Sequence, residues 1–256
     1  MLNESQPKAI LLDLDDTIIA WDAVAEQSWN NVCLSVASET AGLEGKKLFN
    51  AVRETIDWYW GDPVRHQKGR LNLKDARREV VEIALKSLGV NIPFLANKIA
   101  DSYSVEREKA AFLVPDAVNT LKYFKNCGIK LALASNGSPE FQRAKIERFG
   151  LTPFFDCILI EGEFGIGKPE KRFFKQILEQ INVDAAEAWM IGDDLQRDII
   201  GAKKAGIFSI WVDWKGTGIP EPCPVKPDGI VNSLSELLGV FDDRMTKEDT
   251  VGRWVV

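Results

Sequence analysis

Hydrophobic residues in this chain follow two different periods, and these divide it into regions of different predicted architecture. Short, uninterrupted apolar runs occur near the N-terminus and again after residue 128, and such runs are typical of strands buried in a parallel sheet. From about residue 22 to residue 112, apolar residues instead recur at three- and four-residue spacing, which indicates amphipathic helices. The pattern predicts an α/β core interrupted by a helical insertion.

Outside the insertion, predicted strands and helices alternate, which favours a doubly wound parallel sheet. The predicted strands are residues 9–12, 129–134, 157–160, 188–191, 207–212 and 230–231. The predicted helices are residues 117–127, 139–150, 170–180, 198–205 and 234–241. We expect residues 1–20 and 113–241 to form this core and residues 242–256 to form a C-terminal tail.

Residues 21–112 are expected to hold roughly four helices and to form a small domain of their own. Asn72 and Asp75 resemble a capping box at the start of one helix, and Gly89 follows it as a stop. The aromatic and basic segment 58–70 is expected to be a loop. It is either a lid that faces an anionic substrate or a solvated loop whose tryptophans fill the helical core.

The amino-acid composition counts against several classes of protein function for this chain. The net charge of −6 argues against a broad nucleic-acid surface, and no apolar run is long enough to cross a membrane. The N-terminus does not resemble a signal peptide, so a cytoplasmic location is expected. Four widely spaced cysteines predict neither a zinc site nor disulfides, and His66 is the only histidine. Any chemistry must therefore rest on carboxylates, lysine and hydroxyl groups.

Polar residues of these types follow four of the predicted strands. They are Asp13, Asp15 and Asp16 after the first, Ser135 and Asn136 after the second, Lys168-Pro169 after the third, and Gly192-Asp193-Asp194, with Asp198 beyond, after the fourth. Each group alone also fits a turn, an ordinary loop or a helix cap. Because the carboxyl ends of parallel strands share one edge of a sheet, we expect all four groups to meet in one crevice.

Such a set suits phosphoryl transfer. A carboxylate can attack phosphorus and form an aspartyl-phosphate, with Mg²⁺ to neutralise charge. Lys168 and Ser135 could hold the equatorial oxygens of the phosphoryl group. A second carboxylate can protonate the leaving alkoxide, and a spacing of two along a strand puts Asp13 and Asp15 on the same side.

The order of these motifs resembles the haloacid dehalogenase superfamily of aspartate-nucleophile hydrolases. Its four motifs correspond to Asp13-Leu14-Asp15-Asp16-Thr17, Ser135-Asn136-Gly137, Lys168-Pro169 and the segment from Gly192 to Asp198. The resemblance covers residues from about 8 to 240 and implies a Rossmann-like core with a helical cap at residues 21–112. Within the superfamily, the Trp-rich cap is similar to those of N-acylneuraminate-9-phosphatase and related pyrimidine nucleotidases.

The resemblance also implies roles for individual residues. Asp13 would be the nucleophile, Asp15 the acid and base, and Lys168 the bridge between phosphate and nucleophile. Ser135 would contact the phosphate, with Asn136, Gly137 and Thr17 also expected at the substrate. Mg²⁺ would be held by Asp13, Asp193 and the backbone carbonyl of Asp15, with Asp194 and Asp198 supporting the metal site.

These observations predict a Mg²⁺-dependent phosphomonoesterase that acts on a small phosphorylated metabolite, such as a sugar phosphate, acylneuraminate 9-phosphate or nucleoside monophosphate. Neither nucleic acid nor a membrane is expected as a partner. Asp15 disfavours dehalogenation, because dehalogenases of this superfamily need no leaving-group acid and lack an aspartate at that position. A sugar phosphomutase and a non-catalytic binding protein on the same fold remain as alternatives. The sequence names neither the substrate nor the oligomeric state.

Overall fold

The computed structural model describes residues 6–223, 225–239 and 241. The chain divides into two compact units, of which unit 2 is Ala20–Phe112 and unit 1 comprises Met1–Ile19 and Leu113–Val256. The tail predicted at residues 242–256 lies outside the described residues. Among the described residues, no helix combines the length and the apolar character needed to span a bilayer.

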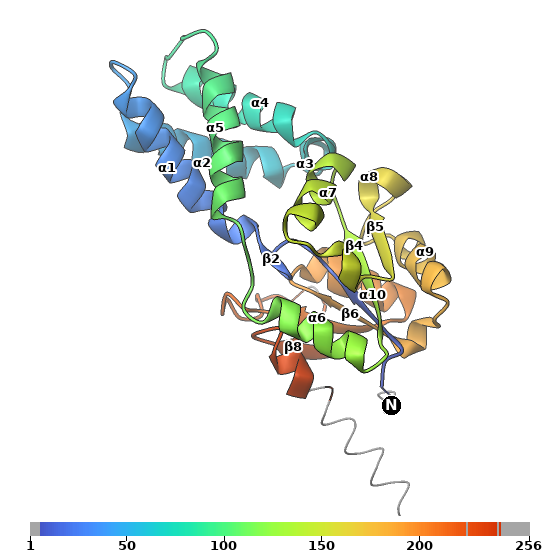
Figure 1. The fold of residues 1–256 in the computed structure, drawn as a ribbon. Coiled ribbons are helices and arrows are strands. Elements are labelled where there is room, and N and C mark those ends of the chain that lie inside the picture. The colour runs from blue at the N-terminus through green and yellow to red at the C-terminus, as the bar shows by residue number, and fades with distance from the viewer. Residues whose placement is uncertain (1–5, 224, 240, 242–256) are drawn as a thin grey trace, which may run out of the picture. The chain divides into compact units, whose positions relative to one another are not determined.

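Unit 1 is built on a six-stranded parallel sheet with the order β5-β4-β1-β6-β7-β8 (Figure 1). The strands are β1 (Ala9–Leu12), β4 (Lys130–Ser135), β5 (Cys157–Ile160), β6 (Ala188–Gly192), β7 (Phe208–Val212) and β8 (Gly229–Val231). The prediction of an α/β fold with a doubly wound parallel sheet is confirmed. β1 lies at the centre and pairs with β4 on one side and with β6 on the other.

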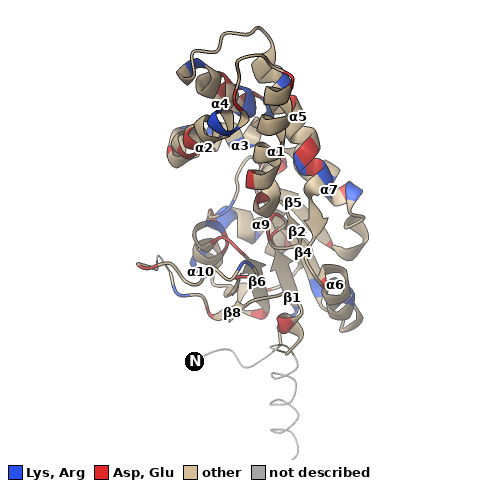
Figure 2. Cartoon of the chain, turned by 90° about the vertical axis from the view of Figure 1, so that its left-hand side faces the viewer, with Lys and Arg blue, Asp and Glu red and all other residues tan. Residues whose placement is uncertain are grey.

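Helices cover both faces of this sheet (Figures 1 and 2). They are α6 (Ala117–Asn126), α7 (Pro139–Arg148), α8 (Glu161–Phe164), α9 (Lys171–Ile181) and α10 (Ile200–Ala205), with short turns η2 (Thr152–Phe154), η3 (Ala185–Glu187) and η4 (Leu195–Ile199). η4 is a π-helical turn that leads directly into α10. The predicted helix at 198–205 therefore begins earlier and changes its geometry at residue 200. A last helical turn covers residues 236–239.

Side chains alternate between the two faces of the sheet along each strand, so a hydrophobic core forms on each face. Ala9 and Leu11 of β1 pack with Phe173 and Phe174 of α9 in one buried cluster. Trp189 of β6 points to the opposite face, because neighbouring strand residues alternate, and its ring lies 6.5 Å from that of Phe241. A sheet buried on both faces explains why its strands read as continuous apolar runs.

Unit 2 is a helical domain. It contains η1 (Asp22–Val24), α1 (Ala25–Ser38), α2 (Gly45–Gly61), α3 (Pro63–Leu71), α4 (Leu73–Ser87) and α5 (Leu95–Ala110). Its core includes Trp29 of α1 stacked on Tyr103 of α5, with ring centroids 3.6 Å apart. α2, α4 and α5 carry many acidic and basic residues (Figure 2), and their buried residues recur at helical spacing, as in amphipathic helices.

The prediction of a loop at residues 58–70 is wrong, because this segment is helical. α2 continues to Gly61, and α3 begins at Pro63 with the Asp62 carboxylate accepting a hydrogen bond from the Arg65 amide. The Arg65 guanidinium lies 3.7 Å above the ring of Trp58 and donates to the Trp58 carbonyl at the end of α2. The Arg65 side chain therefore stabilises the junction between α2 and α3.

The chain passes between the units at two short strands, β2 (Ile19–Ala20) and β3 (Phe112–Leu113), which pair with each other. The sequence pattern does not predict either strand, because two residues are too few to show a period.

Candidate active site

The end of β1 places Asp13 between its two neighbouring strands. Leu12 is in register with Leu133 of β4 and with Ile191 of β6, and the Asp13 amide donates to the Ile191 carbonyl at 2.9 Å. Three residues on, Asp16 has a positive φ of 57°, which turns the chain sharply away from the sheet. The Asp13 carboxylate is thus fixed at the carboxyl edge of the three central strands.

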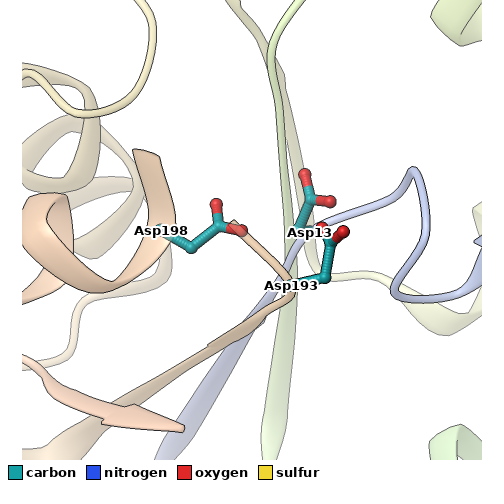
Figure 3. Close-up of side chains that lie close together, drawn as sticks. All are labelled: Asp13, Asp193 and Asp198. Carbon is teal, nitrogen blue, oxygen red and sulfur yellow. The ribbon is translucent and has the colours of Figure 1, made fainter. Parts of the chain in front are cut away.

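Three carboxylates meet at this edge. Oxygens of Asp13, Asp193 and Asp198 all lie within 4.8 Å of one another. Figure 3 shows the Asp13 and Asp193 carboxylates next to each other, and the Asp198 carboxylate turned toward them from the following helical turn. Asp193 immediately follows β6, which is why the parallel register brings it beside Asp13.

Lys168 enters the same cluster from the loop before α9. Its ammonium contacts Asp13 Oδ1 and lies 2.7 Å from Asp198 Oδ1, with only 2% of the side chain exposed. The loop is held by Asn136, whose side-chain oxygen accepts from the Lys168 amide at 2.8 Å and whose amide donates to the Lys168 carbonyl at 2.8 Å. Asn136 therefore positions Lys168 through its backbone.

Burial dominates the electrostatics of this cluster. Burial and the nearby charges of Asp198 and Asp15 raise the pKa of Asp13 to about 7, although Lys168 acts in the opposite direction. Burial and the charge of Asp13 raise the pKa of Asp193 to about 9. Burial alone would lower the pKa of Lys168, but the charges of Asp13 and Asp198 more than offset this and raise it. The cluster therefore holds more carboxylate than one lysine can neutralise.

Asp194 and Asp198 have different surroundings. The Asp194 carboxylate caps η4 by accepting from the amides of Gln196 and Arg197 at 2.8 Å. Asp198 is fully buried, and its Oδ2 accepts from the Asp194 amide at 3.1 Å. The Asp194 side chain thus caps the helical turn η4, whereas the Asp198 carboxylate faces Asp13 and Asp193.

The residues predicted at the substrate follow β4 and β1. Ser135 and Gly137 are buried, and the Ser135 hydroxyl accepts from Gln142 Nε2 at 2.6 Å. Thr17 Oγ1 lies 3.5 Å from Asp13 Oδ2, which is at the limit of a hydrogen bond. Asp15 is about one quarter exposed, and its carboxylate contacts Lys145 and Gln142 of α7.

Lys145 and Gln142 are two site residues that the sequence analysis missed. The spacing of three residues on a helix was a usable signal, but the face that α7 turns toward the sheet depends on tertiary packing. Lys215 was missed as well. Its ammonium contacts Asp16 Oδ2 and lies 4.0 Å from Asp193 Oδ2, and the neighbouring Trp214 indole donates to the Asp16 carbonyl at 2.7 Å.

The donor set fits a hard divalent cation. Asp13 and Asp193 offer carboxylate oxygens side by side, and Mg²⁺ favours one or two carboxylates with the remaining positions filled by other oxygens. Lys168 covers the side of the cluster toward Asp13 Oδ1 and Asp198, which leaves Asp13 Oδ2 and Asp193 as oxygens that could hold a cation. Burial, with repulsion between the carboxylates added to it, raises the pKa of Asp13 and of Asp193, and a bound cation would favour their ionised forms.

Comparisons with known proteins show which family this chain resembles. A model of the haloacid dehalogenase-like hydrolases matches residues 7–206. The phosphoserine phosphatase of Thermus thermophilus is 33% identical over 251 residues, covering 90% of this chain and 97% of that protein. The pyrimidine 5'-nucleotidase YjjG of Escherichia coli is 34% identical over 229 residues, covering 89% and 95%. The structure of YfnB from Bacillus subtilis, crystallised with bound magnesium, superposes with a TM-score of 0.71 at 21% identity, covering 93% of this chain and 99% of that one.

The fold and the family match define an α/β hydrolase, and its acidic cluster lies at the carboxyl edge of the sheet. The chain belongs to the haloacid dehalogenase-like hydrolase family. The prediction of this superfamily is thereby confirmed, and so is the prediction of a phosphatase-type enzyme.

Proposed function

We propose that this chain is a Mg²⁺-dependent phosphomonoesterase that hydrolyses a small phosphate ester through an aspartyl-phosphate on Asp13. The observation that carries the proposal is the convergence of Asp13 and Asp193, at the ends of the adjacent parallel strands β1 and β6, with Lys168 from the loop before α9. Ser135, at the end of β4, is joined to this group through Gln142 and Asp15. Curated relatives that hydrolyse phosphate esters support the same chemistry.

In the first half-reaction, Asp13 attacks phosphorus and the bond from phosphorus to the leaving oxygen breaks. Asp15 gives that oxygen a proton, so the alcohol leaves neutral. In the second, water attacks the phosphorus of the aspartyl-phosphate, and Asp15 takes a proton from the water. Asp13 is regenerated as phosphate leaves, and the sum is ester plus water to alcohol plus phosphate.

The remaining residues stabilise charge. Lys168 faces the Asp13 oxygen that would bridge to phosphorus, and Ser135 donates to an equatorial oxygen. Asp13, Asp193 and the backbone carbonyl of Asp15 would hold Mg²⁺, which supplies neutralisation of the phosphoryl charge when bound. Asp198 and Asp194 hold this arrangement, the first through Lys168 and the second by capping η4. Unit 2 is proposed as the cap that admits and selects the substrate.

A substrate panel tests the proposal. Phosphate release is measured with Mg²⁺ on phosphoserine, glyceraldehyde 3-phosphate, pyrimidine nucleoside monophosphates, acylneuraminate 9-phosphate and an aryl phosphate. Release from one class in preference to the others is the expected result. If no ester is hydrolysed, the hydrolase proposal is overturned. Transfer of the phosphoryl group to a second position of the substrate, without free phosphate, would identify a phosphomutase.

A further inference from the structure

Lys145 of α7 is a buried lysine that faces the proposed acid and base. Only 7% of its side chain is exposed, and its ammonium lies 2.5 and 2.7 Å from the two oxygens of Asp15. A buried ammonium is costly without a carboxylate partner, so this contact is a strong constraint on both side chains. It joins residues that are 130 positions apart in the sequence.

Gln142 lies one turn earlier on the same face of α7 and is 3% exposed. Its Nε2 lies 2.9 Å from Asp15 Oδ2, 2.6 Å from Ser135 Oγ and 2.8 Å from the Asn136 carbonyl. A primary amide has two hydrogens and can serve two of these acceptors at once. Gln142 thus links Asp15 to the end of β4.

The start of α7 fixes both residues relative to the site. Ser138 caps the helix by accepting from the Phe141 amide, and Pro139 occupies its first position. These residues directly follow the Ser135–Gly137 segment, so the strand end and the helix face form one short, continuous unit.

The donors around Asp15 leave one defined place for a proton. A carboxylate has about four lone-pair positions. Lys145 contacts both oxygens and Gln142 contacts Oδ2, which occupies three of them. The remaining position is on Oδ1, and the two contacts from α7 fix the direction in which it points.

We propose that Lys145 and Gln142 are positioning residues that hold the Asp15 carboxyl group in the orientation for proton transfer to the leaving oxygen. This inference rests on the proposed function, because it assigns the two residues to the acid of that reaction. Lys145 holds the acid directly, and Gln142 holds both the acid and the hydroxyl of Ser135. If their role is merely structural, their loss will affect all substrates alike.

Leaving-group dependence separates the two roles. The variants are Lys145→Met and Gln142→Leu, with Arg143→Met as the control. Arg143 lies on the same helix and pairs with Glu163 at 2.8 Å, and 46% of its side chain is exposed. For each variant, kcat/KM is measured on two substrates. One is the aryl ester 4-nitrophenyl phosphate, and the other is an alkyl ester that the wild type hydrolyses, either phosphoserine or a nucleoside monophosphate. This parameter reports steps up to leaving-group departure, and nitrophenolate departs without a proton whereas an alkoxide requires one.

For Lys145→Met we expect kcat/KM to fall about 100-fold on the alkyl phosphate and less than about fivefold on the aryl phosphate. Gln142→Leu should lower kcat/KM about tenfold on the alkyl substrate and by a smaller factor on the aryl substrate, since Ser135 also loses its contact with Gln142. This second variant serves if Lys145→Met does not fold, as judged by circular dichroism. Arg143→Met should match the wild type on both substrates.

A double-mutant cycle completes the test. In an Asp15→Asn background, Lys145→Met should cause no further selective loss on the alkyl phosphate, because the proposed effect requires the Asp15 carboxyl. Equal losses of kcat/KM on both esters, or a further selective loss in the Asp15→Asn background, would overturn the inference about Lys145 and Gln142. The proposed function would still stand in that case, provided that the wild type hydrolyses the esters. A wild type that hydrolyses neither ester would overturn both.

Discussion

The ammonium of Lys168 lies against the carboxylate of Asp13 at a point where both side chains are almost completely buried. Lys168 also contacts Asp198, so one cation is shared between a carboxylate at the end of β1 and one in η4. This arrangement orients the proposed nucleophile and places a positive charge directly beside it.

Removing that cation should destabilise the protein as well as inactivate it. Lys168→Met leaves Asp13 and Asp198 without their shared partner, and loss of one side of a buried ion pair costs on the order of 3 kcal/mol. Urea unfolding at neutral pH measures this loss, and phosphate release should fall at least about 100-fold. Lys175→Met is the control, because Lys175 is an exposed lysine that pairs with Glu179 on α9. Its effect should stay within about 0.5 kcal/mol. Equal stability of the two variants would contradict this account of Lys168.

The acidic cluster should make the metal-free protein less stable as pH rises. The raised pKa values of Asp13, about 7, and Asp193, about 9, lie above the ordinary value of 3.8. Between the ordinary and raised values, the folded protein binds more protons than the unfolded chain, so the free energy of unfolding falls with increasing pH. The urea midpoint without metal should therefore fall from about pH 5 to about pH 9.

Mg²⁺ should reduce this fall, because the cation favours the ionised carboxylates. Asp193→Asn removes one of the titrating groups and one proposed ligand, so the slope should flatten and the stabilisation by Mg²⁺ should diminish. A slope and a Mg²⁺ response that match those of the wild type would show that Asp193 does not belong to the metal site.

Gly192, the last residue of β6, should tolerate no side chain. A Cβ at this position would lie 2.1 Å from Asp198 Oδ2, so Gly192→Ala must displace the Asp198 carboxylate. We expect a loss of about 1–3 kcal/mol in the free energy of unfolding and at least a tenfold loss of phosphate release. Gly61→Ala is the matched control, because a Cβ there would meet no atom within 4 Å. Wild-type activity of Gly192→Ala would show that the Asp198 position is unimportant.

The sheet and the convergence of its strand ends could be predicted from the sequence, because each buried strand is a continuous apolar run followed by polar residues. Asp13 and Asp193 come together simply because their strands are neighbours in register. Helix α3 could also have been found, since Asp62-Pro63 is the same cap and first-turn pair that Ser138-Pro139 forms at α7. This helix is not predicted, because the aromatic and basic composition of residues 58–70 favours the interpretation of the segment as a loop.

Other parts of the site could not be predicted, since they depend on tertiary packing. Lys145 and Gln142 reach Asp15 only because of the rotation of α7 against the sheet. Lys215 reaches Asp16 from a loop after β7, and no periodic pattern specifies where such a loop folds. Charged side chains of this kind read as surface residues in the sequence, although Lys145 is buried.

The most direct test of the central claim is phosphate release by Asp13→Asn beside the wild type, with Mg²⁺ and the best ester of the panel. Asn keeps the size of the side chain but cannot attack phosphorus, so release should fall at least about 1,000-fold. The control Asp57→Asn, at an exposed position on α2, should release phosphate at the wild-type rate. Substantial release by Asp13→Asn would contradict an aspartyl-phosphate on Asp13.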